Sequence, residues 1–158
     1  MSYTTPLSQP LPGATFGQAV HRFFRKYATF SWRASRSEFW WVVLFLGIVT
    51  AVYIGAFFIA LTASGQLETW SSGAAEIVTS GPLMSILFVL WSLWSLFIII
   101  PWLALAARRL HDVNMSAWWL LLYLTGIGSL FVYIVGLIAS NPAGVPYDRP
   151  KLRGGADG

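Results

Sequence analysis

The sequence contains no cysteine and very little charge. Only 10% of its 158 residues are charged, whereas 56% are hydrophobic; a soluble domain carries about 25% charged residues. The lack of cysteine excludes disulfides, thiolate metal sites and cysteine nucleophiles. Because a core of this size cannot enclose so many apolar groups, we expect lipid to surround much of the chain.

Groups that carry catalysis or bind metals are also scarce. The two histidines, His21 and His111, are far apart and lack the spacing of metal ligands. The sequence has no phosphate-binding glycine loop, nucleophile elbow or transporter half-repeat. We therefore expect no cofactor and no metal, and we do not expect an enzyme.

Three long apolar runs dominate the sequence, over residues 39–61, 83–107 and 117–139. A bilayer core of ~30 Å needs about 20 helical residues, so each run is long enough to cross it. They predict an all-α integral membrane protein with about three transmembrane helices inside a membrane domain over 16–140. Gly126 and Gly128 leave an alternative, in which the third run is a re-entrant hairpin.

The segments outside the runs differ in character. Residues 1–15 contain three prolines and predict a disordered N-terminal tail, and residues 141–158 predict a flexible C-terminal tail. Between them, the stretch 16–30 predicts an amphipathic interfacial helix, because its aromatic residues recur at helical spacing opposite a basic face. The alternative is a short helix that packs on the spans and leaves the basic face in water.

Two local signals mark helix ends. Ser35 and Glu38 have the spacing of a capping box at the start of the first run. Asn114 follows the second run and can end that helix.

The distribution of Lys and Arg predicts the orientation. Five precede the first run, none lies in 62–81, two lie at 108–109 and three lie in the C-terminal tail. Basic residues near spans favour the cytoplasm. The N-terminus is therefore expected in the cytoplasm and, with three spans, the C-terminus in the periplasm or outside. A re-entrant third run would return the C-terminus to the cytoplasm.

Two polar groups adjoin the first two runs and are expected on one membrane face. Their members are Arg33, Arg36, Glu38, Arg108, Arg109, His111 and Asp112. Charge at this depth needs a partner or access to water, so we expect Glu38 to pair with Arg108 or Arg109. The groups are interpreted either as interface anchors or as a site for anionic lipid headgroups or a partner protein.

The leading hypothesis is a non-enzymatic membrane module whose cytoplasmic face binds anionic headgroups or a membrane protein partner. The alternative is a small oligomeric channel or transporter with Ser92 and Ser95 along its path. Gly47, Ala51 and Gly55 recur every four residues, which suits close helix packing within the chain or in a homo-oligomer. Nucleic acid is not an expected partner, because the basic residues adjoin the membrane.

The polar groups also carry a family resemblance. The stretch YATFSWRASRSEFWW over 27–41 and the stretch PWLALAARRLHDVNMSAWW over 101–119 resemble the domain of unknown function 805 family. The resemblance implies a bacterial multi-pass inner-membrane protein and no established activity or catalytic residues. Two departures stand out: the family usually has glycine where Trp32 stands, and its closing motif survives only in residues 146–150.

Overall fold

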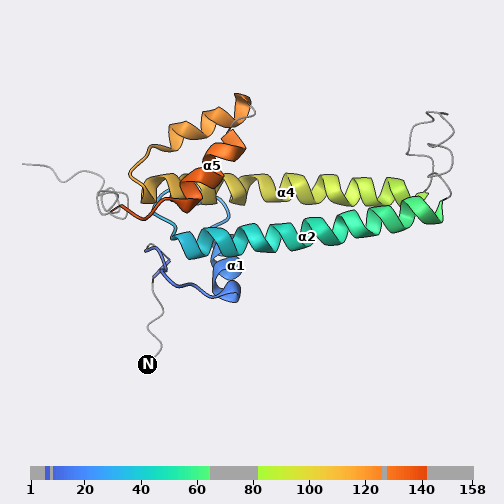
Figure 1. The fold of residues 1–158 in the computed structure, drawn as a ribbon, viewed down its shortest axis with the longest axis horizontal. Coiled ribbons are helices and arrows are strands. Elements are labelled where there is room, and N and C mark those ends of the chain that lie inside the picture. The colour runs from blue at the N-terminus through green and yellow to red at the C-terminus, as the bar shows by residue number, and fades with distance from the viewer. Residues whose placement is uncertain (1–5, 8, 65–81, 126–127, 142–158) are drawn as a thin grey trace, which may run out of the picture. The chain divides into compact units, whose positions relative to one another are not determined.

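The computed structural model describes residues 6–7, 9–64, 82–125 and 128–141, and all regular structure within them is helical. The elements are α1 (Phe16–Arg25), α2 (Arg36–Ala63), α4 (Pro82–Asp112), the 3-10 helix η1 (Ala117–Thr125) and α5 (Gly128–Leu137) (Figure 1). The expected all-α class is confirmed. Most of the 62–81 loop and of the C-terminal tail lies outside the described residues.

The helices α2 and α4 are the two described helices that are long and apolar enough to cross a membrane, with 28 and 31 residues. The chain divides into two compact units, one of residues 1–43 and 100–158 and one of residues 44–99.

Both predicted helix-end signals are confirmed. The Glu38 N–H donates to Ser35 Oγ at 3.2 Å, and the Ser35 N–H donates to Glu38 Oε2 at 3.0 Å, which is a complete capping box at the start of α2. Asn114 has φ 61°, and the Met115 N–H donates to the Leu110 carbonyl at 2.9 Å. The α4 helix therefore continues through the second polar group to Asp112 before the chain turns.

In the unit of residues 44–99, the two long helices run antiparallel and are joined by aromatic side chains. Tyr53 stacks on Trp91 with ring centroids 4.1 Å apart, and Phe45 meets Trp94 at 6.5 Å. A small apolar cluster follows nearer the 62–81 loop, formed by Phe57, Ala60, Leu61, Met84 and Leu87. Most remaining side chains here are exposed and apolar, as expected for helices surrounded by lipid.

The small-residue stripe of α2 makes no close contact within the described chain. A Cβ atom added at Gly47 or Gly55 would meet no heavy atom of the described residues within 4 Å. The stripe is thus not used in the way that the internal-packing interpretation predicted.

In the unit of residues 1–43 and 100–158, α1 is shorter than the predicted interfacial helix and differs in what it buries. It ends at Arg25, whereas the prediction extended it to residue 30. Its inner side contains Ala19 and Phe23, as an amphipathic helix requires, but Arg22 is buried as well, with Lys26 just beyond. The basic side of α1 is therefore partly enclosed in protein.

The described part of the N-terminal tail is bound to the start of α2, in contrast to the predicted disorder. The Leu11 N–H donates to Glu38 Oε2 at 3.1 Å, and the Ala14 N–H donates to Ser37 Oγ at 3.1 Å. The Trp41 indole N–H donates to the Ala14 carbonyl at 2.7 Å. A buried carboxylate needs hydrogen-bond donors, and this segment supplies one.

The third apolar run forms two short elements in place of the single helix expected over 117–139. Trp119 of η1 stacks on Phe131 of α5 with centroids 5.5 Å apart, so the two elements fold back on each other. Glycine favours such a division because of its low helix propensity. Helix α5 packs closely on α2, since a Cβ at Gly136 would lie 2.5 Å from Phe39 Cε1.

Candidate functional site

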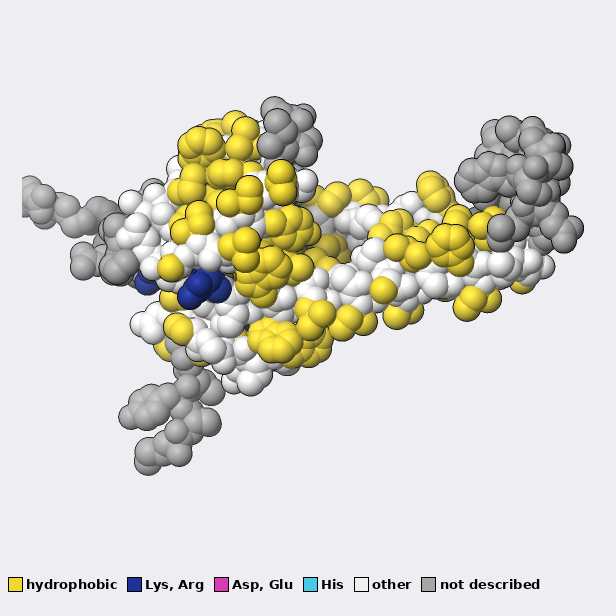
Figure 2. Space-filling model, viewed as in Figure 1, with side chains coloured by type: hydrophobic (Ala, Val, Ile, Leu, Met, Phe, Trp, Pro, Cys, Tyr) yellow, Lys and Arg dark blue, Asp and Glu magenta, His cyan; other side chains and the backbone are white. Residues whose placement is uncertain are grey.

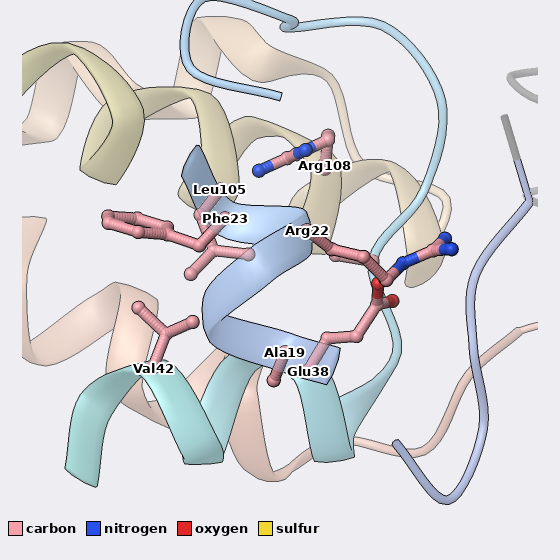
Figure 3. Close-up of a pocket in the computed structure, with 8 residues that line it drawn as sticks. Ala19, Arg22, Phe23, Glu38, Val42, Leu105 and Arg108 are labelled. Atoms are coloured by element: carbon pink, nitrogen blue, oxygen red, sulfur yellow. The ribbon is translucent and has the colours of Figure 1, made fainter. Parts of the chain in front are cut away.

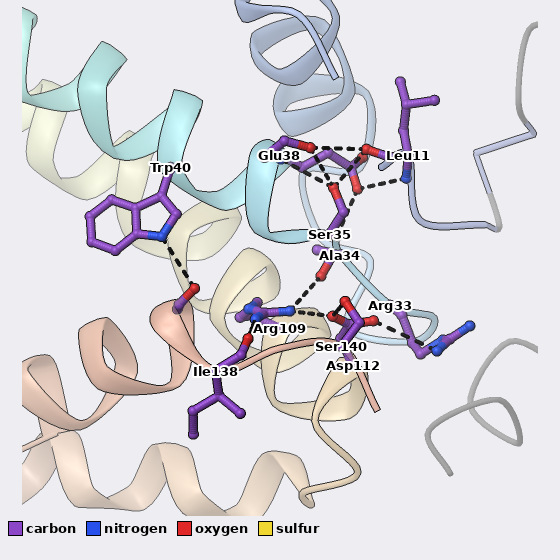
Figure 4. A network of polar contacts seen from close by, with 12 residues as sticks. Leu11, Arg33, Ala34, Ser35, Glu38, Trp40, Arg109, Asp112, Ile138 and Ser140 are labelled. Carbon is purple, nitrogen blue, oxygen red and sulfur yellow. Dashed lines mark hydrogen bonds and ion pairs between the residues drawn. The ribbon is translucent and has the colours of Figure 1, made fainter. Parts of the chain in front are cut away.

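Glu38 is the centre of one polar cluster, which we call the Glu38 cluster and which comprises Leu11, Arg22, Ser35 and Glu38. Glu38 is 3% exposed. Oε1 accepts a hydrogen bond from Arg22 Nε at 2.5 Å. Oε2 accepts from the N–H groups of Leu11 and Ser35 (Figure 4). Charge-assisted bonds of this kind are the stronger ones, so the cluster joins the N-terminal segment, α1 and α2.

The predicted pairing of Glu38 with Arg108 or Arg109 is wrong. Among the described residues, the ion pair of Glu38 is made by Arg22. Arg108 Nε donates to the Ala104 carbonyl of its own helix at 3.1 Å, and Glu38 attracts Arg108 only at longer range. The prediction failed because Arg22 was assigned to the polar face of α1, opposite its aromatic residues, whereas Arg22 is buried.

Arg22, Glu38 and Arg108 nevertheless border a common cavity, shown in Figure 3. Its volume is ≈ 10 Å³. A volume of that order is enough for about one water molecule. The two predicted polar groups therefore meet across this small space without forming a direct salt bridge.

Asp112 is the centre of a second cluster, the Asp112 cluster, which comprises Arg33, Arg109, Asp112 and Ser140. Its Oδ2 accepts hydrogen bonds from Arg109 Nη1 and, at 2.5 Å, from Ser140 Oγ. Its Oδ1 lies 3.6 Å from Arg33 Nη1. The cluster ties the end of α4 to the loop before α2 and to the segment after α5 (Figure 4).

Arg109 is fully enclosed and links several parts of the same unit. Besides Asp112, its guanidinium donates to the Ile138 carbonyl and, at 3.5 Å, to the Ala34 carbonyl. Its Nε has no hydrogen-bond partner among the described residues. A buried cation is tolerated when it is paired and hydrogen-bonded in this way.

His111 is half-buried and contacts the backbone of the loop before α2. Its Nδ1 lies 3.2 Å from the Trp32 carbonyl. Trp32 has φ 73°, in the left-handed region that glycine adopts most easily. This conformation would suit the glycine that the family resemblance implies at this position. The indole compensates in part, because Lys26 Nζ lies 5.9 Å from the ring centroid.

Replacing Trp32 with glycine should give a more stable protein than replacing it with alanine. Both variants lose the indole, but alanine keeps the left-handed strain of ~1–2 kcal/mol whereas glycine loses ~0.5–1 kcal/mol of conformational entropy. We expect an advantage of about 0.5–1 kcal/mol for Trp32→Gly in detergent unfolding titrations. At an ordinary loop position the glycine variant should not be more stable than the alanine variant. If Trp32→Ala were the more stable of the two, the left-handed backbone conformation at this position would be contradicted.

A larger pocket opens beside the two clusters, with a volume of ≈ 420 Å³. It is lined by Pro10, Pro12, Gly13, Arg33, Ser35, Arg36, Ser37, Asp112 and Ser140. Arg36 is the exposed first residue of α2, and the N–H groups of Arg36 and Ser37 donate to no described residue. Free N–H groups at a helix N-terminus, together with guanidinium groups, favour an anion.

The geometry suits binding better than proton transfer. The Glu38 carboxylate accepts hydrogen bonds from a guanidinium and two backbone N–H groups, the Asp112 carboxylate accepts from a guanidinium and a hydroxyl, and His111 Nδ1 lies near a backbone carbonyl. No group of three His, Cys, Asp or Glu side chains within the described residues could hold a metal ion.

All seven residues predicted for the site lie in one unit, and three further residues that were not predicted belong to it as well. Arg22, Leu11 and Ser140 complete the two clusters. Ala19, 1% exposed on the same side of α1, is the signal that could have indicated Arg22, because a small residue marks a close helix contact. Leu11 contributes only its backbone N–H to the Glu38 cluster, so its side chain gives no signal in the sequence. The spacing between Asp112 and Ser140 likewise does not indicate that they are in contact.

The fold and the site together define a small multi-pass membrane protein with paired charges gathered in one unit. Residues 27–149 match the family described as protein of unknown function (DUF805), and the chain belongs to this family. It is similar to inner membrane protein YhaH of Escherichia coli strains K12 and O157:H7, each 29% identical over 122 residues that cover 77% of this chain and 85% of the relative. No solved structure matches it.

Proposed function

We propose that this protein is a non-enzymatic membrane module that binds anionic lipid headgroups at its cytoplasmic face. The observation that carries the proposal is the ≈ 420 Å³ pocket lined by Arg33, Arg36 and the first turn of α2. Ligand pockets in proteins commonly enclose about 300–1,000 Å³, so a headgroup fits within it.

The charges around the pocket favour a negative ligand. Asp112 also lines it, but Arg109 lies against that carboxylate and balances its charge. Arg33 and Arg36 then leave an excess of positive charge, and the N-terminal end of the α2 dipole adds to it. A phosphate can accept hydrogen bonds from a guanidinium and from the free N–H groups at the same time.

The position of the pocket favours a lipid as the source of that phosphate. It lies at the start of α2, where the exposed apolar surface of the helix begins with Trp40 and Trp41. Their indole N–H groups donate to backbone carbonyls, which suits rings at the membrane–water boundary. Basic pockets beside transmembrane helices on the cytoplasmic side are suited to lipid headgroups.

The orientation in this proposal rests on the basic residues. Four Lys or Arg precede α2, Arg36 begins it and two more lie near the end of α4, whereas residues 62–81 have none. By the positive-inside rule, the unit with the pocket faces the cytoplasm. The channel alternative has less support, because the Ser92 hydroxyl donates to the Phe88 carbonyl of its own helix at 2.8 Å.

Replacing Arg36 with glutamine should weaken binding of phosphatidylglycerol, whereas replacing Arg25 should not. Both arginines are exposed, but Arg25 does not line the pocket. One basic residue near an anionic headgroup contributes about 1 kcal/mol, which corresponds to about five-fold in affinity. Native mass spectrometry of the detergent-solubilised chain, titrated with phosphatidylglycerol and with phosphatidylcholine of equal acyl length, measures the effect.

The two variants separate the possible outcomes. Weaker phosphatidylglycerol binding by Arg36→Gln alone supports the pocket. Equal binding by both variants, or no preference over phosphatidylcholine, rejects it. A stoichiometric polypeptide that is retained by the wild type and lost only from Arg36→Gln would show a protein partner in place of a lipid.

A further inference from the structure

We infer that η1 and α5 form a re-entrant hairpin that enters one leaflet and returns the chain to the face it left. The hairpin begins at Ala117, shortly after α4 ends at Asp112. It ends where Ser140 Oγ and the Asn141 N–H bond to Asp112, the latter to the backbone carbonyl at 2.8 Å. Both ends of the hairpin therefore lie at the same end of α4.

The depth of the hairpin follows from the helix it packs against. Tyr133 of α5 lies 6.1 Å from Trp102 and 6.4 Å from Phe39, measured between ring centroids. Trp102 precedes the end of α4 by ~15 Å at 1.5 Å per residue. Helix α5 has ten residues and the same length of ~15 Å. This is half of a ~30 Å hydrocarbon core, so α5 spans about one leaflet.

The outer surface of the hairpin is apolar, and the acyl chains of that leaflet contact it. Trp118 is 77% exposed, Leu130 is 62% exposed and Leu137 is 65% exposed. Figure 2 shows apolar side chains covering the outer side of this hairpin. Because α2 and α4 need lipid around them, lipid also covers a surface that packs beside their ends. Backbone N–H and C=O groups in lipid must form hydrogen bonds within the protein, and the helical backbone of η1 and α5 meets this requirement.

The distribution of charge agrees with this arrangement. A full third span would place Arg149, Lys151 and Arg153 on the opposite side from the other seven basic residues. With a re-entrant hairpin, all ten Lys and Arg lie on one side and residues 62–81 lie on the other. The exception to the positive-inside rule is thereby removed.

Single cysteines at Ser72, Ser116 and Ala143 test the inference, because the natural chain has no cysteine. In intact cells and in inverted vesicles, a membrane-impermeant maleimide should label Ser116→Cys and Ala143→Cys from the same side, and Ser72→Cys from the other. Labelling of Ala143→Cys together with Ser72→Cys would show a full third span and overturn the inference. Labelling of all three from one side would overturn it as well.

A spin label at position 130 tests the lipid contact separately. In reconstituted membranes, a label on Leu130→Cys should collide more with oxygen than with a water-soluble nickel chelate. A label on His21→Cys, exposed on α1, supplies the comparison from the same unit. Preferential collision of the Leu130 label with the chelate would contradict lipid around the hairpin.

Discussion

Replacing Glu38 with alanine should lower the free energy of unfolding by about 3–5 kcal/mol, as expected when a buried charge loses its partner. The change leaves Arg22 without its carboxylate, removes one half of the α2 capping box and frees the Leu11 N–H. Unfolding in mixed micelles, followed by tryptophan fluorescence or circular dichroism, measures the loss.

Two further variants show whether the buried pair is the cause. Arg25→Gln removes an exposed charge from the same helix as Arg22 and should change stability by less than about 0.5 kcal/mol. In a double-mutant cycle of Arg22→Gln and Glu38→Gln, the double variant should lose less than the two single variants together. Additive losses would mean that Arg22 and Glu38 do not interact.

Replacing Asp112 with alanine should have a comparable effect, about 3–5 kcal/mol, because Arg109 would remain enclosed without its carboxylate. The change also removes the acceptor that holds Ser140 and the ion pair with Arg33. We expect the segment after α5 to detach from α4. Faster amide hydrogen exchange over residues 128–141, with little change in residues 44–64, would report that detachment.

Ser140→Ala is the matched control for Asp112. It removes one hydrogen bond to the carboxylate and leaves Arg109 paired, so its cost should be only about 1.5–3 kcal/mol. Its exchange pattern should lie between those of the wild type and Asp112→Ala. Equal losses in Ser140→Ala and Asp112→Ala would show that the arginine pairing contributes nothing to this cluster.

The long helices and their ends could be predicted because local rules determine them. The lengths of the apolar runs indicated α2 and α4, and the Ser35–Glu38 spacing indicated the cap that the structure contains. The left-handed residue Asn114 follows from the same short-range chemistry. These features depend on residues within a few positions of one another, so one sequence suffices to recognise them.

The partners of the buried charges could not be predicted, because they depend on packing between distant segments. Arg22 and Glu38 are 16 positions apart, and Asp112 and Ser140 are 28 apart. Periodicity placed Arg22 on a polar helix face but could not show that this face turns inward against α2. The form of the third run also depends on contacts between distant segments. Its length fits a full span, whereas the close packing of Gly136 on Phe39 favours the hairpin.

The two clusters and the pocket form one continuous arrangement in the unit of residues 1–43 and 100–158. The Glu38 cluster holds the N-terminal segment, whose Pro10, Pro12 and Gly13 form part of the pocket wall. The Asp112 cluster holds Arg33 and Ser140, which form another part. The buried ion pairs thus position the pocket, and the remaining exposed arginine, Arg36, is available to a ligand.

Photo-cross-linking with an anionic lipid tests the proposed headgroup site most directly. Phosphatidylglycerol with a photoreactive group on its headgroup would be reconstituted with the wild-type chain, and the modified peptides identified by mass spectrometry. Our account predicts cross-links at residues 10–13, 33–37 and 140 that decrease in Arg36→Gln and persist in Arg25→Gln. Cross-links spread evenly over the chain, or unchanged in Arg36→Gln, would contradict a headgroup site in this pocket.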